Sequence, residues 1–219
     1  MELRVTPLWR APVEPEGRKV APERIRSLKV GVLALQGDVD AHMRALEGLG
    51  LAPSRVKYPK DLKGLDALIL PGGESTTIGR LMERFELLQP LREFGESGKA
   101  IMATCAGMVL VAREIIGFPQ QPRLSLMDIS VERNAFGRQI NSFEAELEIK
   151  GLSGGPFRAV FIRAPVAKRA GPSVEVLAQL PEGIVAAREG KILALAFHPE
   201  LTDDPRLHLY FLEIAAGLR

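Results

Sequence analysis

Short, nearly all-apolar segments that alternate with helix-like segments are the feature that most limits how this chain can fold. Three of them, at residues 29–35, 66–70 and 99–104, have the length and composition of β-strands buried on both faces. The segments with helical spacing of apolar residues that follow the strands are 38–49, 76–86, 88–96 and 106–116, with a further short strand at 55–58. Alternating strands and helices indicate a parallel sheet with helices on both faces.

The second half of the chain has a different pattern, in which strand-like segments follow one another with little helix between them. These segments are 127–132, 142–149, 159–162, 174–179, 184–188 and 192–197. A final amphipathic helix is expected over residues 204–218. The two halves together predict an α/β fold, a three-layer sandwich whose central, mostly parallel sheet carries an antiparallel extension.

The 219 residues correspond to one domain with a short appendage. Residues 1–27 contain four prolines and lack the apolar core of a secretory signal, so they are expected to form a poorly ordered extension. The folded domain is expected over residues 28–219, where positive and negative charges balance. A neutral domain argues against nucleic acid as a partner, because phosphate binding needs clustered positive charge.

Other classes of protein are excluded by residue counts. No apolar run approaches the eighteen or so residues of a transmembrane helix, so no membrane association is expected and a cytoplasmic location is predicted. One cysteine cannot form a disulfide framework, and with three histidines the chain lacks the ligands of a structural zinc site.

The single cysteine, Cys105, lies where the predicted strand 99–104 meets the predicted helix 106–116. The small residues around it allow a tight turn, which is the strand–turn–helix context of a nucleophile elbow. The start of the helix also favours the thiolate form of the sulfur. The alternative is a buried structural cysteine, because cysteine is among the most buried residue types.

His198 directly follows the apolar segment 192–197, and Glu200 lies two residues further on. The carboxyl ends of parallel strands share one edge of the sheet, so His198 is expected beside Cys105. A catalytic Cys–His pair needs a third group to orient the imidazole, and a carboxylate does this. A lone histidine here would be interpreted as a capping or loop residue; the cysteine and the carboxylate favour the catalytic interpretation.

Paired glycines, Gly72 and Gly73, stand at the end of the predicted strand 66–70 and open into a helix. Such a loop can direct backbone N–H groups at a negatively charged oxygen. A simple turn and a phosphate cradle are the alternatives, although the Gly-Lys-Ser/Thr element of a P-loop is absent.

Several strings of residues carry a resemblance to a known family. LPGGEST, TCAGM and FHPE resemble the class I glutamine amidotransferases, whose fold is flavodoxin-like and whose triad is Cys–His–Glu. VGVLALQGD, VERNAFGRQ, SFEAEL, FIRAP and AFHPELT are similar to the family of glutaminase subunits of pyridoxal 5′-phosphate synthase. The similarity runs from about residue 29 to the C-terminus.

The resemblance implies a role for each matching residue. It makes Cys105 the nucleophile, His198 the base and Glu200 the orienting carboxylate. The residues it implies for glutamine binding are Gly73, Glu74, Ser75, Arg133, Ile162 and Arg163. The oxyanion hole is placed at the backbone of Gly72, Gly73 and Ala106. No cofactor and no metal is implied.

Arg133 suits the α-carboxylate of a zwitterionic substrate because a guanidinium binds a carboxylate in a bidentate manner. The alternative is a salt-bridged loop arginine. His42 and His208 lie on predicted helices with no nearby nucleophile, so both are expected to be surface or packing residues.

The function implied is hydrolysis of L-glutamine to glutamate and ammonia through a cysteine thioester. The ammonia would pass to a separate synthase subunit in a large hetero-oligomer that makes pyridoxal 5′-phosphate. The alternatives are the glutaminase subunit of another amidotransferase pathway, a γ-glutamyl hydrolase, and a non-catalytic scaffold subunit. An intact set of Cys105, His198 and Glu200 argues against the scaffold.

Overall fold

The computed structural model describes residues 22–137 and 142–219. Within these ranges, ten strands form one central sheet. They are β1 (Val30–Leu33), β2 (Ser54–Val56), β3 (Ala67–Leu70), β4 (Ala100–Thr104), β5 (Ala112–Ile115), β6 (Met127–Glu132), β9 (Val166–Ala170), β10 (Glu175–Leu180), β11 (Gly183–Glu189) and β12 (Ile192–Leu195). A separate hairpin pairs β7 (Ser142–Leu147) with β8 (Phe157–Ile162).

The sheet has a parallel half and a mostly antiparallel half. The order is β2-β1-β3-β4-β12-β11-β9-β6-β5, with β10 paired to β11. β2, β1, β3, β4 and β12 run parallel to one another, whereas β11 is antiparallel to its neighbours β12, β10 and β9. β6 is antiparallel to β9 and parallel to β5. This arrangement confirms the predicted parallel sheet with an antiparallel extension.

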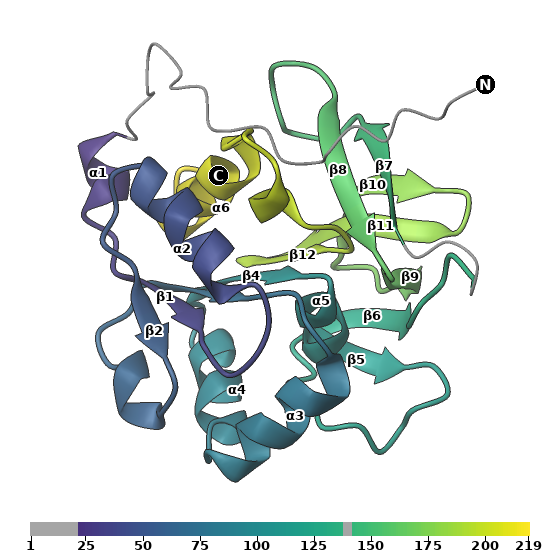
Figure 1. Cartoon of the computed structure of the whole chain (residues 1–219), viewed down its shortest axis with the longest axis horizontal. Helices are drawn as coiled ribbons and strands as arrows, with labels where there is room; N and C mark the ends of the chain where they lie inside the picture. Colours follow the sequence, from purple (N-terminus) through teal and green to yellow (C-terminus); the bar gives the residue numbers. More distant parts are fainter. Residues whose placement is uncertain (1–21, 138–141) are drawn as a thin grey trace, which may run out of the picture.

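Helices cover both faces of the parallel half (Figure 1). One face carries α1 (Glu23–Arg26), α2 (Val39–Gly48) and α6 (Arg206–Ala215), and the other carries α3 (Ser75–Arg84), α4 (Leu88–Glu96) and α5 (Ala106–Val111). Short 3₁₀ turns lie at Pro59–Leu62 and Pro199–Leu201. Because both faces are covered, every residue of β1, β3, β4 and β12 is buried, which explains their continuous apolar sequences.

Two strands differ from the sequence prediction. The helix expected over 106–116 ends at Val111, and the chain becomes extended at Ala112 to form β5. Parallel pairing with β6 supplies the hydrogen bonds that the helix would have given, so tertiary pairing overrides the local pattern. β9 was not predicted, because its basic residues Lys168 and Arg169 hide the strand alternation; they pair with Glu132 and Asp128.

The packed domain also starts earlier than residue 28. Residues 23–26 form α1, and the side chain of Ile25 is only 1% exposed in the core. A single apolar side chain among charged neighbours gives no recognisable helix pattern in the sequence. The predicted extension therefore includes residues 23–26. The rest of the predicted extension, residues 1–21, lies outside the described residues.

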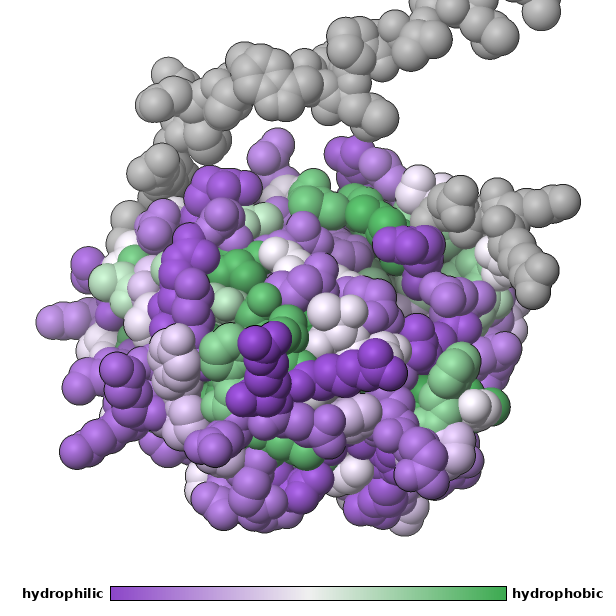
Figure 2. Space-filling view, turned by 60° about the horizontal axis from the view of Figure 1, so that its bottom comes forward, coloured by the Kyte–Doolittle hydropathy of each residue, from purple (hydrophilic) through white to green (hydrophobic). Residues whose placement is uncertain are grey.

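One face of the molecule is mostly polar (Figure 2). Figure 2 shows one face on which hydrophilic side chains predominate and apolar areas are small and separate. Over the residues that the structure describes, no helix has the length and apolar character needed to cross a bilayer.

Candidate active site

Cys105 lies at the turn between β4 and α5, at the carboxyl edge of the parallel half of the sheet. Its backbone has φ 48° and ψ −102°, and its N–H donates to the carbonyl of Leu195 at 2.8 Å. The turn is tight because Gly107 packs on β3: a Cβ at Gly107 would lie 2.4 Å from the carbonyl oxygen of Leu70. The backbone therefore has the nucleophile-elbow form that the sequence predicts.

His198 and Glu200 follow β12, the strand that pairs in parallel with β4. The pairing puts Leu195 opposite Thr104, so His198 emerges at the edge that carries Cys105. His198 Nδ1 lies 2.7 Å from Glu200 Oε1. Gly72, at the end of β3, leaves room for the imidazole, since a Cβ there would lie 2.3 Å from His198 Cε1.

The charge state of the histidine follows from these contacts. Burial lowers the pKa of His198, but contacts with the Cys105 sulfur and with Glu200 outweigh burial and raise this pKa to about 10. Burial raises the pKa of Glu200, and the contact with His198 opposes that rise. The ring thus lies between the sulfur and a buried carboxyl group, and both contacts favour its protonated form.

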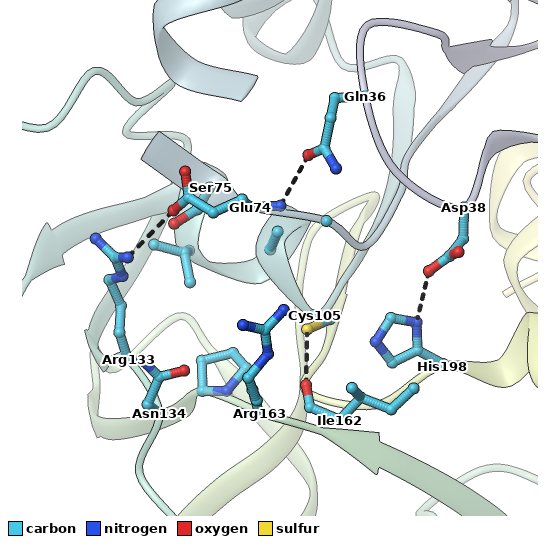
Figure 3. A pocket seen from close by; sticks show the side chains of 14 residues that line it. Gln36, Asp38, Glu74, Ser75, Cys105, Arg133, Asn134, Ile162, Arg163 and His198 are labelled. Carbon is cyan, nitrogen blue, oxygen red and sulfur yellow. Dashed lines mark hydrogen bonds and ion pairs between the residues drawn. The ribbon is translucent and has the colours of Figure 1, made fainter. Parts of the chain in front are cut away.

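A second carboxylate, Asp38, lies 3.5 Å from His198 Nδ1 and was not predicted as a site residue (Figure 3). It stands between β1 and α2, at the same edge of the sheet. Gln36, on the same loop, accepts a hydrogen bond from the N–H of Glu74 at 2.8 Å. Their position directly after an apolar strand was a signal in the sequence that could have identified both residues.

Glu74 caps the start of α3 and faces the cavity. Its carboxylate accepts hydrogen bonds from the N–H groups of Thr76 and Thr77, at 3.0 and 2.7 Å, and from the Thr77 hydroxyl. Burial raises the pKa of Glu74, but these hydrogen bonds outweigh it and lower the pKa to about 2. Glu74 is thus a fixed negative charge at the rim, and Ser75 beside it is buried.

Arg133, in the turn after β6, points its guanidinium at Glu74. Nη2 lies 3.2 Å from Glu74 Oε1, and Nη1 donates to Gln121 Oε1 at 2.8 Å and to Thr76 Oγ1 at 3.1 Å. The guanidinium also lies 4.6 Å from the centre of the Phe118 ring. Arg133 therefore forms a salt bridge, as the alternative interpretation of a loop arginine expects. Both partners of this salt bridge also line the cavity.

The turn between β8 and β9 completes the far wall. The carbonyl oxygen of Ile162 lies 3.7 Å from the Cys105 sulfur (Figure 3). Arg163 follows with φ 43°, in the left-handed region, and its side chain lines the cavity.

These residues enclose a cavity of about 250 Å³. The predicted site residues that line it are Gly73, Glu74, Ser75, Cys105, Ala106, Arg133, Ile162, Arg163 and His198. Gly72 and Glu200 lie next to the His198 ring but do not line the cavity. Lining residues that the sequence prediction missed are Gln36, Asp38, Val109, Asn134 and Pro165.

Asp38, His198 and Glu200 bring potential metal-ligand atoms within 4.8 Å of one another. Two of these side chains, His198 and Glu200, form a hydrogen bond to each other.

His42 and His208 are buried packing residues rather than surface residues, with 0% and 1% exposure. The sequence did not predict the contact of His42 with the proposed triad, in which His42 Nε2 lies 3.3 Å from Glu200 Oε2. His42 stands at helical spacing with Val39 and Leu46 on the buried face of α2, which was an available signal.

The geometry thus combines a nucleophile, a protonated base with its carboxylate, and charged groups around a small cavity. A thiolate attacks a carbonyl carbon, an imidazolium protonates the leaving group, and N–H groups at a helix start stabilise an oxyanion. This set of groups is suited to acyl transfer from a small polar substrate.

Comparisons with known proteins agree with this chemistry. The model of the SNO glutamine amidotransferase family matches residues 32–216. The chain is 58% identical over 187 residues to "Pyridoxal 5′-phosphate synthase subunit PdxT" of Thermus thermophilus, a match that covers 85% of this chain and 97% of that protein. The protein of the same name from Geobacillus kaustophilus is 55% identical over 187 residues, covering 85% and 94%.

Solved structures give the same result. A crystal structure described as a glutamine amidotransferase has a TM-score of 0.81 at 55% identity and covers 85% of this chain and 98% of that one. A chain in the structure of PurLQS from Thermotoga maritima has a TM-score of 0.62 at 17% identity, covering 88% and 99%. The second likeness concerns the fold alone.

Proposed function

The chain belongs to the SNO glutamine amidotransferase family, and from this premise we propose that it hydrolyses L-glutamine to glutamate and ammonia as one of the subunits of a pyridoxal 5′-phosphate synthase. The observation that carries the proposal is the contact of a buried, carboxylate-bound His198 with Cys105 on a nucleophile elbow.

The proposed reaction has two steps, formation of a thioester on Cys105 and its hydrolysis, and His198 transfers a proton in each. The Cys105 thiolate attacks the side-chain carbonyl carbon of glutamine, and a tetrahedral oxyanion forms. The His198 imidazolium gives its proton to the amide nitrogen, the C–N bond breaks and ammonia leaves a thioester. Neutral His198 then takes a proton from water, whose oxygen attacks the thioester; glutamate leaves and the sulfur returns to the thiolate.

Oxyanion stabilisation is assigned to the backbone N–H groups of Gly72, Gly73 and Ala106. Ala106 is the first residue of α5, where a helix leaves its N–H groups without intrahelical partners. Gly73 and Ala106 both line the cavity beside the sulfur.

Glutamine recognition is assigned to the opposite wall. Arg133 suits the α-carboxylate and Glu74, held ionised, suits the α-ammonium. Gly73, Ser75, Ile162 and Arg163, which also line the cavity, are likewise assigned to glutamine binding.

The ammonia is proposed to pass to a separate synthase subunit within a large hetero-oligomer in the cytoplasm. Support comes from the relatives, which are named as subunits of pyridoxal 5′-phosphate synthase and are 55–58% identical to this chain. Ammonia released at an open cavity would be protonated and lost, so the partner is expected to cover the site. Residues 23–219, which include α1, are proposed to act as a single glutaminase domain.

A coupled assay tests the proposal. Glutamate release is measured with and without the purified synthase subunit, and Cys105→Ala serves as the control. We expect weak activity alone, marked stimulation by the partner and none in the control. Equal turnover with and without the partner, or turnover of γ-glutamyl peptides without ammonia transfer, would favour a γ-glutamyl hydrolase or another pathway.

A further inference from the structure

Two buried histidines lie behind the triad, on the opposite side of Glu200 from the cavity. His42 belongs to α2 and His208 to α6, helices that lie next to each other on one face of the sheet (Figure 1). His42 Nδ1 is 3.1 Å from His208 Nε2. Neither side chain lines the cavity, so neither is explained by substrate binding.

The carboxylate of Glu200 lies between His198, on the cavity side, and His42, on the side away from the cavity. Oε1 accepts from His198 Nδ1 at 2.7 Å, while Oε2 lies 3.3 Å from His42 Nε2. Oε2 is fully buried and, among the described residues, forms no hydrogen bond of normal geometry. His42 Nε2 also lies 3.2 Å from the Thr104 hydroxyl, so it points between that hydroxyl and the carboxylate.

The direction of the hydrogen bonds follows from the charge of the rings. Burial lowers the pKa of His42 well below its ordinary value, and burial lowers that of His208 to about 4, so both rings are neutral. A neutral imidazole has one N–H and one acceptor nitrogen. If His208 Nε2–H donates to His42 Nδ1, the proton of His42 must sit on Nε2, where it faces the Glu200 carboxylate.

We propose that His42 is a positioning residue of this active site, whose Nε2–H binds Oε2 of Glu200 and so fixes the carboxylate that orients His198. His208 has the supporting task of holding His42 in the required tautomer. The opposite tautomer would point a nitrogen lone pair at a buried carboxylate, which is unfavourable. The inference rests on the proposed function, because it assigns His42 to the acid–base step of that reaction.

The variants His42→Leu and His42→Gln separate positioning from packing. Leucine fills similar space without a donor, whereas the glutamine amide places an N–H near the original Nε2. Leu46→Ala, on the same buried face of α2, is the matched control for lost stability. The measured quantities are kcat and KM for glutamine with the synthase subunit present, normalised to active sites counted by labelling with a chloroketone analogue of glutamine.

We expect His42→Leu to lower kcat per active site about 10- to 100-fold, the loss typical of one hydrogen bond to a buried charge, with little change in KM. His42→Gln should recover most of this loss, and Leu46→Ala should lower Tm with kcat per site unchanged. Equal kcat per site in His42→Leu and the unmodified chain would overturn the proposal, and so would an equal loss in the leucine and glutamine variants.

A second measurement needs no variant and no activity. Nitrogen-15 NMR of the histidine rings in the full chain reports which nitrogen of His42 holds the proton. Because burial lowers the pKa of His42 well below its ordinary value, we expect a neutral ring protonated at Nε2 at neutral pH. A proton on Nδ1 would refute the proposal. Absence of glutaminase activity in the unmodified chain would instead refute the proposed function.

Discussion

The two walls of the cavity are built in different ways. The proposed catalytic side, formed by Cys105, His198 and Glu200, follows the ends of two neighbouring buried strands and is itself buried. The binding side, formed by Glu74 and Arg133, comes from a helix start and a loop and is partly open to solvent. Backbone pairing therefore fixes the reacting atoms, whereas side-chain hydrogen bonds hold the recognition groups.

This difference has a consequence for substrate binding. Three acceptors already occupy the guanidinium of Arg133: Glu74, Thr76 and Gln121. If Arg133 binds the substrate carboxylate as proposed, that carboxylate competes with these partners. We therefore expect the binding side to adjust when glutamine enters and the catalytic side to keep its arrangement. Substitutions on the catalytic side should consequently lower kcat, whereas substitutions on the binding side should raise KM.

The largest effect is expected at the sulfur. Cys105→Ala removes the nucleophile, so partner-stimulated glutamate release should fall about 10,000-fold or more. The far-ultraviolet circular dichroism should stay unchanged, because a methyl group replaces a small side chain. Residual turnover near the original rate would show that the reaction does not pass through a thioester, since Cys105 is the only cysteine of the chain.

The next effect is expected at His198. His198→Asn removes the acid–base group while an amide can still bind Glu200, and kcat should fall about 1,000-fold or more with KM nearly constant. Labelling of Cys105 with iodoacetamide at pH 7 should slow in parallel, since the imidazolium no longer stabilises the thiolate. If labelling keeps its rate, the contact between the ring and the sulfur does not determine reactivity.

A contrasting effect is expected on the binding side. Arg133→Ala removes charge recognition of the substrate, so KM for glutamine should rise about 10- to 100-fold with kcat little changed. Arg133→Lys, which keeps the charge but not the bidentate geometry, should recover only part of the loss. A fall in kcat at constant KM would move Arg133 from recognition to catalysis and remove the distinction between the walls.

The smallest effect concerns stability in acid. Because the pKa of Glu74 is lowered to about 2 in the folded chain, its stabilising contribution is present above the ordinary value near 4.5 and is lost as the pH falls toward 2. Solvent screening of a half-exposed group keeps this contribution to about 1 kcal/mol or less. Urea unfolding at pH 6 and pH 3 should give a smaller difference for Glu74→Gln than for the unmodified chain; equal differences would contradict the assignment.

The placement of Cys105, His198 and Glu200 at one edge of the sheet was predictable from the sequence, because each residue lies next to a recognisable strand. Cys105 interrupts a strand-to-helix junction and His198 follows an apolar strand, and parallel pairing of those strands brings them together. Glu200 is then fixed by its distance of two residues from His198. The local sequence pattern and the pairing of β4 with β12 indicate the same placement of these residues. Predicting it therefore required no knowledge of contacts between distant side chains.

The contacts that the sequence did not predict form between distant segments. His42 contacts Glu200 and His208 across more than 150 residues of chain, and periodicity shows only that His42 faces inward. β5 and β9 were missed for a related reason, since pairing partners elsewhere in the chain decide whether those residues become strands. Periodicity identifies the buried face of an element but not the residue that lies opposite.

The backbone conformation of Cys105 sets the stability of the fold against the proposed catalytic role of this residue. Its φ of 48° with ψ near −102° is a conformation that glycine adopts freely and that costs other residues about 1–3 kcal/mol. Cys105→Gly would therefore be expected to relieve strain at this turn, with a higher Tm as its sign, while abolishing turnover. Cys105, the proposed nucleophile, would then lower the thermal stability of the fold. Selection for thermal stability alone would replace it by glycine.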